Sequence, residues 1–219
     1  MAFTTITGDL TTSTVMAVGD TVVALEGSSI ITFSNGIAST GTANGTKVYA
    51  NGAIVTIGQA VHMYGTDTGA ADGVGNHLLV VGSTGSLTGN QYGATLAGSG
   101  NTLINWGEMS GLSRDTVELV NADNAYVENH GMMFGYRAGL RFTGSDDVDV
   151  VNFGTISAIT NNGVGLDSSQ GSVFNAGTIS AAADGRSAIS VSSTLVQGRS
   201  DIENTGTITS PVIAINGQS

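Results

Sequence analysis

The fold of this chain is decided by a short stretch at residues 150–157, which reads VVNFGTIS. Nearly the same phrase returns at residues 173–180 as VFNAGTIS and at residues 202–209 as IENTGTIT. Self-similarity at a fixed period marks repeat architectures, in which equivalent units stack on one another. The phrase therefore predicts a chain built from stacked units.

An Asn-x-Gly pair aligns five copies of the unit along the second half of the chain. The pairs are Asn105 and Gly107, Asn129 and Gly131, Asn152 and Gly154, Asn175 and Gly177, and Asn204 and Gly206. Apolar residues alternate with polar ones on both sides of each pair, and no window shows the i, i+3, i+4, i+7 pattern of a helix. Short strands with a period of roughly 23 residues predict an all-β fold, a right-handed parallel β-helix (β-solenoid).

One β-helix domain is expected over residues 1–219. Residues 101–219 form its regular N-x-G-x-I coils, whereas residues 1–100 read as N-terminal strands and degenerate coils. In this half, short apolar segments such as TVVALEGSSIITF (21–33) are again separated by Gly and Asn. At about 4.8 Å per strand layer, roughly nine coils make a rod about 45 Å long.

Composition limits the possible partners. Seventeen carboxylates oppose six Lys and Arg, for a net charge of −11, so the chain repels phosphate backbones and nucleic acid is not expected as a partner. The absence of cysteine excludes disulfides and thiolate metal sites. No apolar stretch reaches the length of a transmembrane segment.

The N-x-G-x-I run between residues 101 and 215 resembles the repeats of bacterial secreted and surface β-helix proteins. These include the passenger domains of adhesins and autotransporters, and regions of proteins exported by type I secretion. The resemblance implies an extracellular or cell-surface location. Because the N-terminus lacks a basic region followed by an apolar one, we expect export without a classical signal peptide.

The Asn and Gly columns are interpreted as structural turn devices. Asn tolerates a left-handed backbone, and stacked Asn amides can bond from coil to coil, while Gly relieves crowding at the bend. The triplets Thr155–Ser157, Thr178–Ser180 and Thr207–Thr209 place hydroxyl groups outward. Ordinary strand propensity explains them better than an ice-binding surface does.

A calcium site is considered at Asp146, Asp147 and Asp149, because carboxylate oxygens at such spacing suit Ca²⁺. A solvated acidic turn is the favoured alternative, and no other cofactor is expected. Asp67 and Asp72 are a weaker case in a Gly-rich loop.

Polysaccharide lyases and hydrolases built on β-helices use Arg and paired carboxylates, which draws attention to one group of residues. Its members are Asp115, Asp123, His130, Arg137 and Arg141. They match no recognised signature, so a surface cluster is favoured and the chain is not expected to be an enzyme. Trp106, Phe153 and Phe174 lie at or beside the Asn turns, where they pack between coils or stack on a sugar or a neighbouring subunit.

The expected function is structural. Without capping helices, the two ends of a solenoid invite further strands, so head-to-tail assembly into a fibre or surface layer is the leading hypothesis. In a variant of this hypothesis, the N-terminal strands add to an exposed sheet edge of a neighbouring molecule. The alternatives are a segment of a larger adhesin that binds glycans or surfaces, and a polysaccharide lyase or hydrolase.

Overall fold

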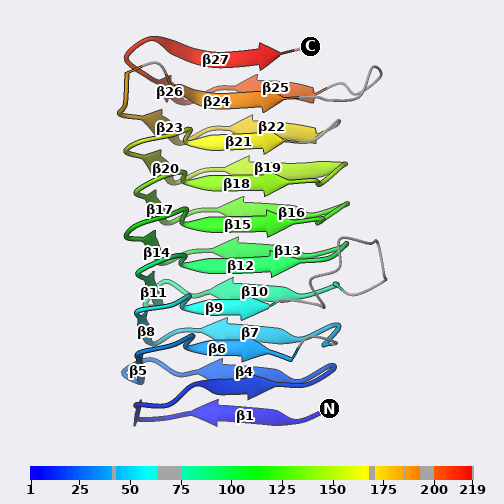
Figure 1. Cartoon of the computed structure of the whole chain (residues 1–219), viewed down its shortest axis with the longest axis vertical. Helices are drawn as coiled ribbons and strands as arrows, with labels where there is room; N and C mark the ends of the chain where they lie inside the picture. Colours follow the sequence, from blue (N-terminus) through cyan, green and yellow to red (C-terminus); the bar gives the residue numbers. More distant parts are fainter. Residues whose placement is uncertain (41–42, 64–74, 168–170, 185, 193–199, 219) are drawn as a thin grey trace.

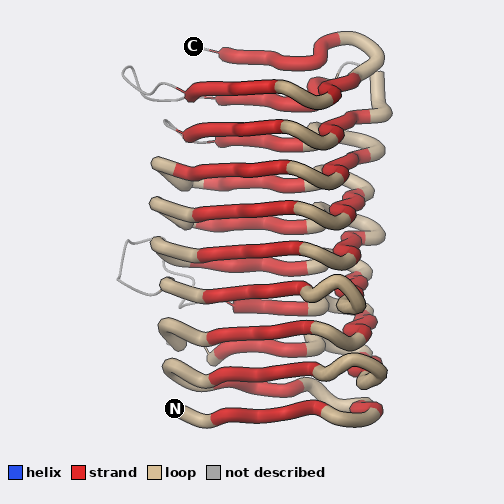
Figure 2. Tube along the Cα trace, turned by 180° about the vertical axis from the view of Figure 1, so that it is seen from behind, coloured by secondary structure: helices blue, strands red, loops and turns tan. Residues whose placement is uncertain are grey.

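The computed structural model describes residues 1–40, 43–63, 75–184 except 168–170, 186–192 and 200–218. Every regular element in these ranges is a β-strand, and the strands wind into three parallel sheets that run the length of a rod (Figure 1). The N-terminus lies at one end of the rod and the last strand at the other (Figure 1). Seen from behind, the same three-strand coil repeats from end to end (Figure 2).

Each sheet contains nine strands. Sheet A is β1 (Phe3–Ile6), β4 (Thr21–Ala24), β7 (Lys47–Ala50), β10 (Leu78–Val81), β13 (Thr102–Asn105), β16 (Tyr126–Asn129), β19 (Val148–Asn152), β22 (Gly171–Asn175) and β25 (Ser200–Asn204). Sheet B is β2 (Asp9–Leu10), β5 (Ser29–Thr32), β8 (Ala53–Thr56), β11 (Ser86–Gly89), β14 (Glu108–Gly111), β17 (Met132–Gly135), β20 (Thr155–Ala158), β23 (Thr178–Ala181) and β26 (Thr207–Thr209). Sheet C is β3 (Thr14–Met16), β6 (Ile37–Ser39), β9 (Val61–Met63), β12 (Ala94–Ala97), β15 (Val117–Val120), β18 (Leu140–Thr143), β21 (Val164–Asp167), β24 (Ser187–Ser192) and β27 (Ile213–Gln218).

Every strand pairs in parallel with its equivalent one coil on. Asn129, for example, is in register with Asn105 on one side and Asn152 on the other. This pairing confirms the predicted parallel β-solenoid. Three corners complete each coil, and we call them A/B, B/C and C/A after the sheets they join.

The core fills the inside of the coil with alternate residues of each strand. Ile54, Leu103, Met133 and Phe142 are completely buried, and buried side chains of this kind continue along nearly the whole rod. Because side chains of successive strand residues point to opposite faces, the polar residues between them face outward.

The described strands of residues 1–100 belong to the same three sheets as the regular coils. Their repeat is weak in the sequence because their corners differ in length, so that the step from β1 to β4 is much shorter than the step from β7 to β10. They also lack the Asn column. In its register these coils carry apolar residues, namely Ile6, Ala24, Ala50 and Val81.

In the described part of the chain there is no helix with the length and apolar character required to cross a membrane.

Candidate functional site

The five ladder asparagines line the inside of corner A/B. The Nδ2 of Asn105 donates to Oδ1 of Asn129 at 2.8 Å, and the same bond repeats from Asn129 to Asn152, from Asn152 to Asn175 and from Asn175 to Asn204 at 2.7–2.8 Å. None of the five has a positive φ, so the proposed left-handed role is wrong for this column. Left-handed Asn and Asp residues occur instead at Asn76, Asn121, Asn124 and Asp147.

The glycine that follows each ladder asparagine by two residues allows a close approach between coils. A Cβ added at Gly131 would overlap the carbonyl oxygen of Gly107, and one added at Gly154 would overlap that of Gly131. Such overlap excludes any side chain. The Asn and Gly columns are thus parts of the scaffold, and four of the five asparagines are completely buried.

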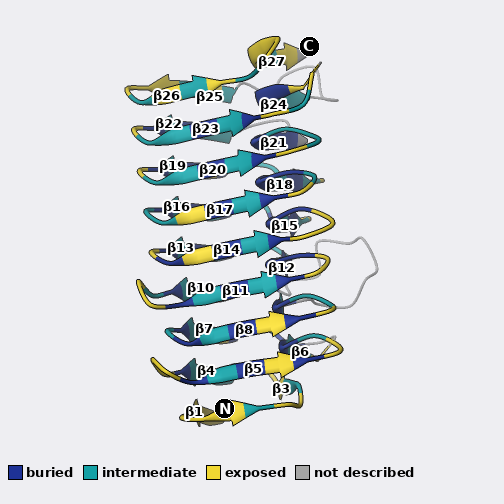
Figure 3. Ribbon diagram, turned by 90° about the vertical axis from the view of Figure 1, so that its left-hand side faces the viewer, coloured by how far each residue is buried: buried dark blue, intermediate teal, exposed yellow. Residues whose placement is uncertain are grey.

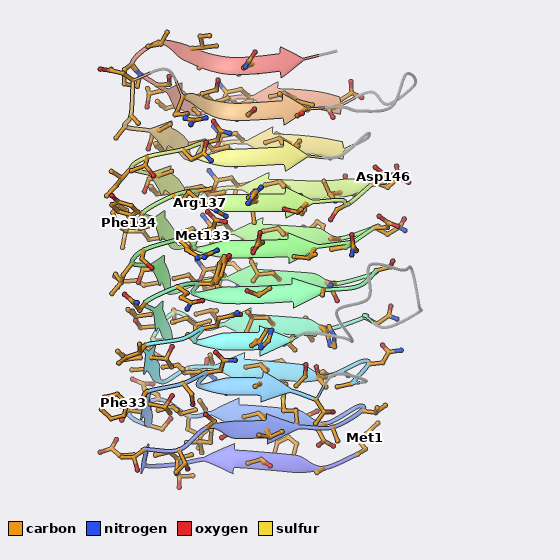
Figure 4. The ribbon with its side chains drawn as sticks, in the orientation of Figure 1. Met1, Phe33, Met133, Phe134, Arg137 and Asp146 are labelled. Atoms are coloured by element: carbon orange, nitrogen blue, oxygen red, sulfur yellow. The ribbon has the colours of Figure 1, made fainter. Side chains whose placement is uncertain are left out.

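Of the three aspartates considered for calcium, Asp146 (Figure 4) and Asp147 lie at corner C/A, and Asp149 lies on β19 of sheet A. The backbone N–H of Asp146 donates to the carboxylate of Asp123 at 2.9 Å, and Asp149 accepts from the hydroxyl of Ser172 at 2.6 Å. Asp147 and Asp149 line a recess of about 390 Å³ with Tyr126. Within the described ranges, no three His, Asp or Glu side chains are grouped to hold a metal ion, and calcium binding here stays a prediction.

Charged residues gather at corner B/C. Asp115 is completely buried, and its two carboxylate oxygens accept from Nε and Nη2 of Arg137 at 2.8 and 2.5 Å. The backbone N–H of Ala138 also donates to Asp115, at 3.0 Å. The carboxylate raises the pKa of Arg137 beyond its ordinary value, against the effect of partial burial. Arg137 is therefore held in a bidentate ion pair with Asp115.

The other members of the group considered for polysaccharide chemistry are spread over the coil. Arg141 lies on β18 of sheet C and pairs with Glu118 at 3.5 Å. Asp123 lies at corner C/A, and His130 at corner A/B, where it bonds to Glu128. The structure thus joins two of the five residues, Asp115 and Arg137, in direct contact. The guanidinium of Arg137 already donates to the carboxylate of Asp115.

An aromatic stack runs along the outside of corner A/B. The rings of Trp106 and His130 are parallel within 4°, with centroids 3.7 Å apart, and Phe153 stacks on His130 at 4.8 Å. Phe174 meets Phe153 edge to face at 5.9 Å. Trp106 and Phe153 remain 50% and 47% exposed. Packing between coils and a solvent-facing aromatic surface therefore coexist here.

The stack is held by a carboxylate on sheet A. Glu128 accepts from Tyr126 at 2.8 Å and bonds with Nε2 of His130 at 2.5 Å. The bond from His130, followed by that from Tyr126, lowers the pKa of Glu128. Burial raises the pKa of Tyr126 to about 12, so its hydroxyl stays protonated as a donor. The alignment of the Asn-x-Gly copies contains a signal for this stack, because Trp106, His130 and Phe153 each directly follow a ladder asparagine.

A buried histidine lies at corner C/A. Nδ1 of His77 bonds with the hydroxyl of Thr46 at 2.7 Å, and its backbone N–H donates to Asn101 at 3.0 Å. Its Nε2 is buried without a hydrogen-bond partner among the described residues. Burial lowers the pKa of His77 to about 4, so the ring is neutral at pH 7.

These features define a parallel β-solenoid with an internal amide ladder and an exposed aromatic stack. Compared with known proteins, the chain matches no family model, no curated protein and no solved structure.

Proposed function

We propose that this chain is a non-enzymatic structural subunit, which assembles end to end into an extracellular fibre or surface layer. The observation that carries the proposal is the form of the two ends of the rod. Among the described strands, β1, β2 and β3 pair only with β4, β5 and β6 at one end, and β25, β26 and β27 pair only with β22, β23 and β24 at the other. Three unpaired edges at each end are templates for further strands.

The core is open at the C-terminal end. Ile213 and Ile215 of β27 are 46% and 44% exposed, and Ile202 and Ile208 are only half-buried. These four side chains continue the registers of buried residues in the coil before. Apolar surface of this kind is stabilised when another coil covers it.

A second copy can continue all three registers. In sheet B, Ile208 and Leu10 belong to the same column of in-register residues, so Ile208 would pack on Leu10 of the next copy. In sheet C, Ile215 would pack on Thr14 for the same reason. In sheet A, Asn204 falls over Ile6, which cannot extend the amide ladder. That mismatch costs about 1–3 kcal/mol, against about ten new backbone hydrogen bonds worth roughly 1 kcal/mol each.

The contact is heterologous, because it joins two different surfaces. A heterologous contact that does not close into a ring makes a filament. The N-terminal strand β1 pairs with β4 of its own chain, so the junction uses the outer edge of β1 and needs no strand exchange.

Electron microscopy of the purified chain tests the proposal. Rods much longer than one molecule are expected, and Ile215→Asp should abolish them by placing a charge in the junction. Leu25→Asp is the control, because Leu25 is 41% exposed at corner A/B of the second coil and is not part of either end strand. Only single particles across a range of salt and Ca²⁺ concentrations would contradict end-to-end assembly.

A second candidate function is favoured by the aromatic stack. A β-solenoid segment of a larger adhesin would bind glycans through exposed aromatic rings, and Trp106 offers a half-exposed indole. Trp106 is the only tryptophan in the chain, so its fluorescence reports on this surface alone. Titration with neutral and acidic oligosaccharides should quench or shift that signal. An unchanged spectrum over millimolar ligand would exclude sugar stacking on Trp106.

A further inference from the structure

An apolar stripe runs along the outside of sheet B and the start of corner B/C. It is defined by eight side chains that are 39–91% exposed: Ile31, Phe33, Val55, Ile57, Leu112, Met132, Tyr136 and Ile159. Figure 3 looks onto this side of the rod, and Figure 4 shows Phe33 and Phe134 projecting from it. The coil with Ser86, Thr88 and Asn90 divides the stripe into two apolar patches, and exposed apolar patches mark interaction sites.

One column of the stripe has a symmetrical order. The residue directly after each sheet B strand lies in register with its equivalent, since the N–H of Leu112 donates to Gly89 at 3.0 Å and that of Tyr136 donates to Gly111 at 2.9 Å. Over five coils this column reads Phe33, Ile57, Asn90, Leu112 and Tyr136. Over these five coils it is aromatic, aliphatic, amide, aliphatic and aromatic, the same chemical order in both directions. The column continues with Ile159, whose N–H donates to Gly135 at 3.1 Å, outside the symmetrical run.

Charge restricts what can approach this face. Among the described residues, only Asp9 and Glu108 place carboxylates on the outer face of sheet B. Sheet A and corner C/A carry eight carboxylates within the same described ranges: Asp20, Asp123, Glu128, Asp146, Asp147, Asp149, Asp201 and Glu203. With a net charge of −11, two copies of the chain repel less when their sheet B faces meet than when their sheet A faces meet.

We propose that sheet B is a homotypic interface, through which two copies pair face to face and antiparallel about a two-fold axis at Asn90. This axis crosses the rod, so it reverses the order of the coils and keeps each column opposite itself. Phe33 then meets Tyr136 of the second copy, Ile57 meets Leu112, and Asn90 meets Asn90. The contact is isologous and closed.

The neighbouring columns fit the same axis. Ile31 falls opposite Phe134, and Thr88 opposite Thr88. Glu108 falls opposite Ala53 and therefore not opposite its own carboxylate. A two-fold axis along the rod would instead exchange the columns across the sheet, setting Phe33 against Ser29. The antiparallel arrangement sets Phe33 against Tyr136 and separates Leu112 from Glu108. Val55 and Met132 then fall opposite Ser110 and Ser29.

The area of the face is sufficient for a weak dimer. Seven coils at about 4.8 Å and five residues at about 3.3 Å give a surface of roughly 34 by 16 Å. Two copies together would bury about 1,100 Å², slightly above the roughly 1,000 Å² expected of a specific interface. The lateral contact uses none of the end strands' free edges, so it is independent of end-to-end assembly.

Sedimentation equilibrium of the full chain carrying Ile215→Asp measures pairing with the end contact blocked. We expect a dimer whose dissociation constant rises at least tenfold on Leu112→Glu and less than twofold on Leu25→Glu. The two leucines are 53% and 41% exposed, so the control makes the same change at a similar site outside the stripe. A monomer at all concentrations, or equal effects of the two substitutions, would overturn the proposal.

Single cysteines test the geometry, because the chain has none of its own. Facing sheets lie about 10 Å apart, beyond the roughly 4.4–6.8 Å Cα separation of a disulfide, so a short bis-maleimide is the reagent of choice. Asn90→Cys should cross-link to itself. Phe33→Cys should not, but it should cross-link when mixed with Tyr136→Cys. Self-linking of Phe33→Cys without that of Asn90→Cys would overturn the antiparallel arrangement.

Discussion

Asn129 and Asn152 are joined by a hydrogen bond of 2.8 Å from Nδ2 to Oδ1, although they lie 23 residues apart. The same Nδ2 also approaches the carbonyl oxygens of Gly131 and Thr155 at 3.3 and 3.2 Å. Each ladder asparagine therefore satisfies polar groups of its own corner and of the next coil. Since both side chains are completely buried, no water is available to replace these bonds.

Removal of a central ladder amide should strongly destabilise the fold. Asn152→Ala leaves the Nδ2 of Asn129 and the Oδ1 of Asn175 without their partner, and we expect a loss of about 3 kcal/mol. Asn204→Ala is the matched control, because that side chain is the exposed end of the ladder, and its loss should be below about 1 kcal/mol. Urea unfolding followed by circular dichroism gives both values. Equal losses would show that the ladder is not cooperative.

The glycine column should tolerate no side chain. A Cβ at Gly154 would lie 2.6 Å from the backbone carbon of His130 as well as against the Gly131 oxygen, so Gly154→Ala should cost at least about 3 kcal/mol. At Gly165 in β21, the nearest atom to an added Cβ is 3.8 Å away. Gly165→Ala should change stability by less than about 0.5 kcal/mol. Thermal unfolding compares the two, and a stable Gly154→Ala would refute the close-approach explanation.

The ion pair at corner B/C should be worth more than the one on sheet C. Asp115→Asn removes the charge from a buried partner of Arg137, and we expect a loss of about 3 kcal/mol. Glu118→Gln weakens the more exposed pair with Arg141, with a loss below about 1 kcal/mol. A double-mutant cycle with Arg137→Gln should give a coupling above about 1 kcal/mol. A coupling near zero would mean that Asp115 acts only through the N–H of Ala138.

Stability should fall as the pH is lowered through the range in which His77 titrates. The pKa of His77 is about 4 in the folded chain against 6.5 for the free side chain, so the unfolded chain takes up a proton first. The free energy of unfolding is therefore unaffected by this titration above pH 6.5. It falls by about 3 kcal/mol in total as the pH is lowered from 6.5 to about 4.

His77→Gln provides the comparison for this pH dependence. The variant should be less stable at pH 7, because the bond with Thr46 changes, but its stability should vary less between pH 6.5 and 4. Guanidinium unfolding at several pH values gives both slopes. A variant that keeps the full slope would exclude His77 as its source.

The regular half of the fold could be predicted because its corners are nearly equal in length. Asn152 of VVNFGTIS and Asn175 of VFNAGTIS lie 23 residues apart, as Asn129 and Asn152 do, so the same side chains return to the same positions. The first half could be predicted only as degenerate coils. Its corners vary in length, and residues such as Ala24 and Val81 stand where the later coils carry Asn.

The candidate sites were less predictable, for a geometrical reason. Asp115 and Arg137 are 22 residues apart, and their contact depends on the conformation of two corners of unequal length. The sequence predicted the positions of the Asn column correctly, but it could not predict the backbone conformation of these residues. Asn is favoured both by stacked amides and by left-handed turns, so its presence does not distinguish the two.

The sequence by itself determined that this chain winds into parallel coils, because a repeated alternation of apolar residues can bury its apolar face only against its own neighbours. Only the tertiary structure decided which surfaces those coils leave open. The exposed isoleucines of β27, the Trp106 stack and the symmetrical column centred on Asn90 each arise where corners and ends place residues side by side. Such neighbours are set by three-dimensional register, which local sequence pattern does not specify.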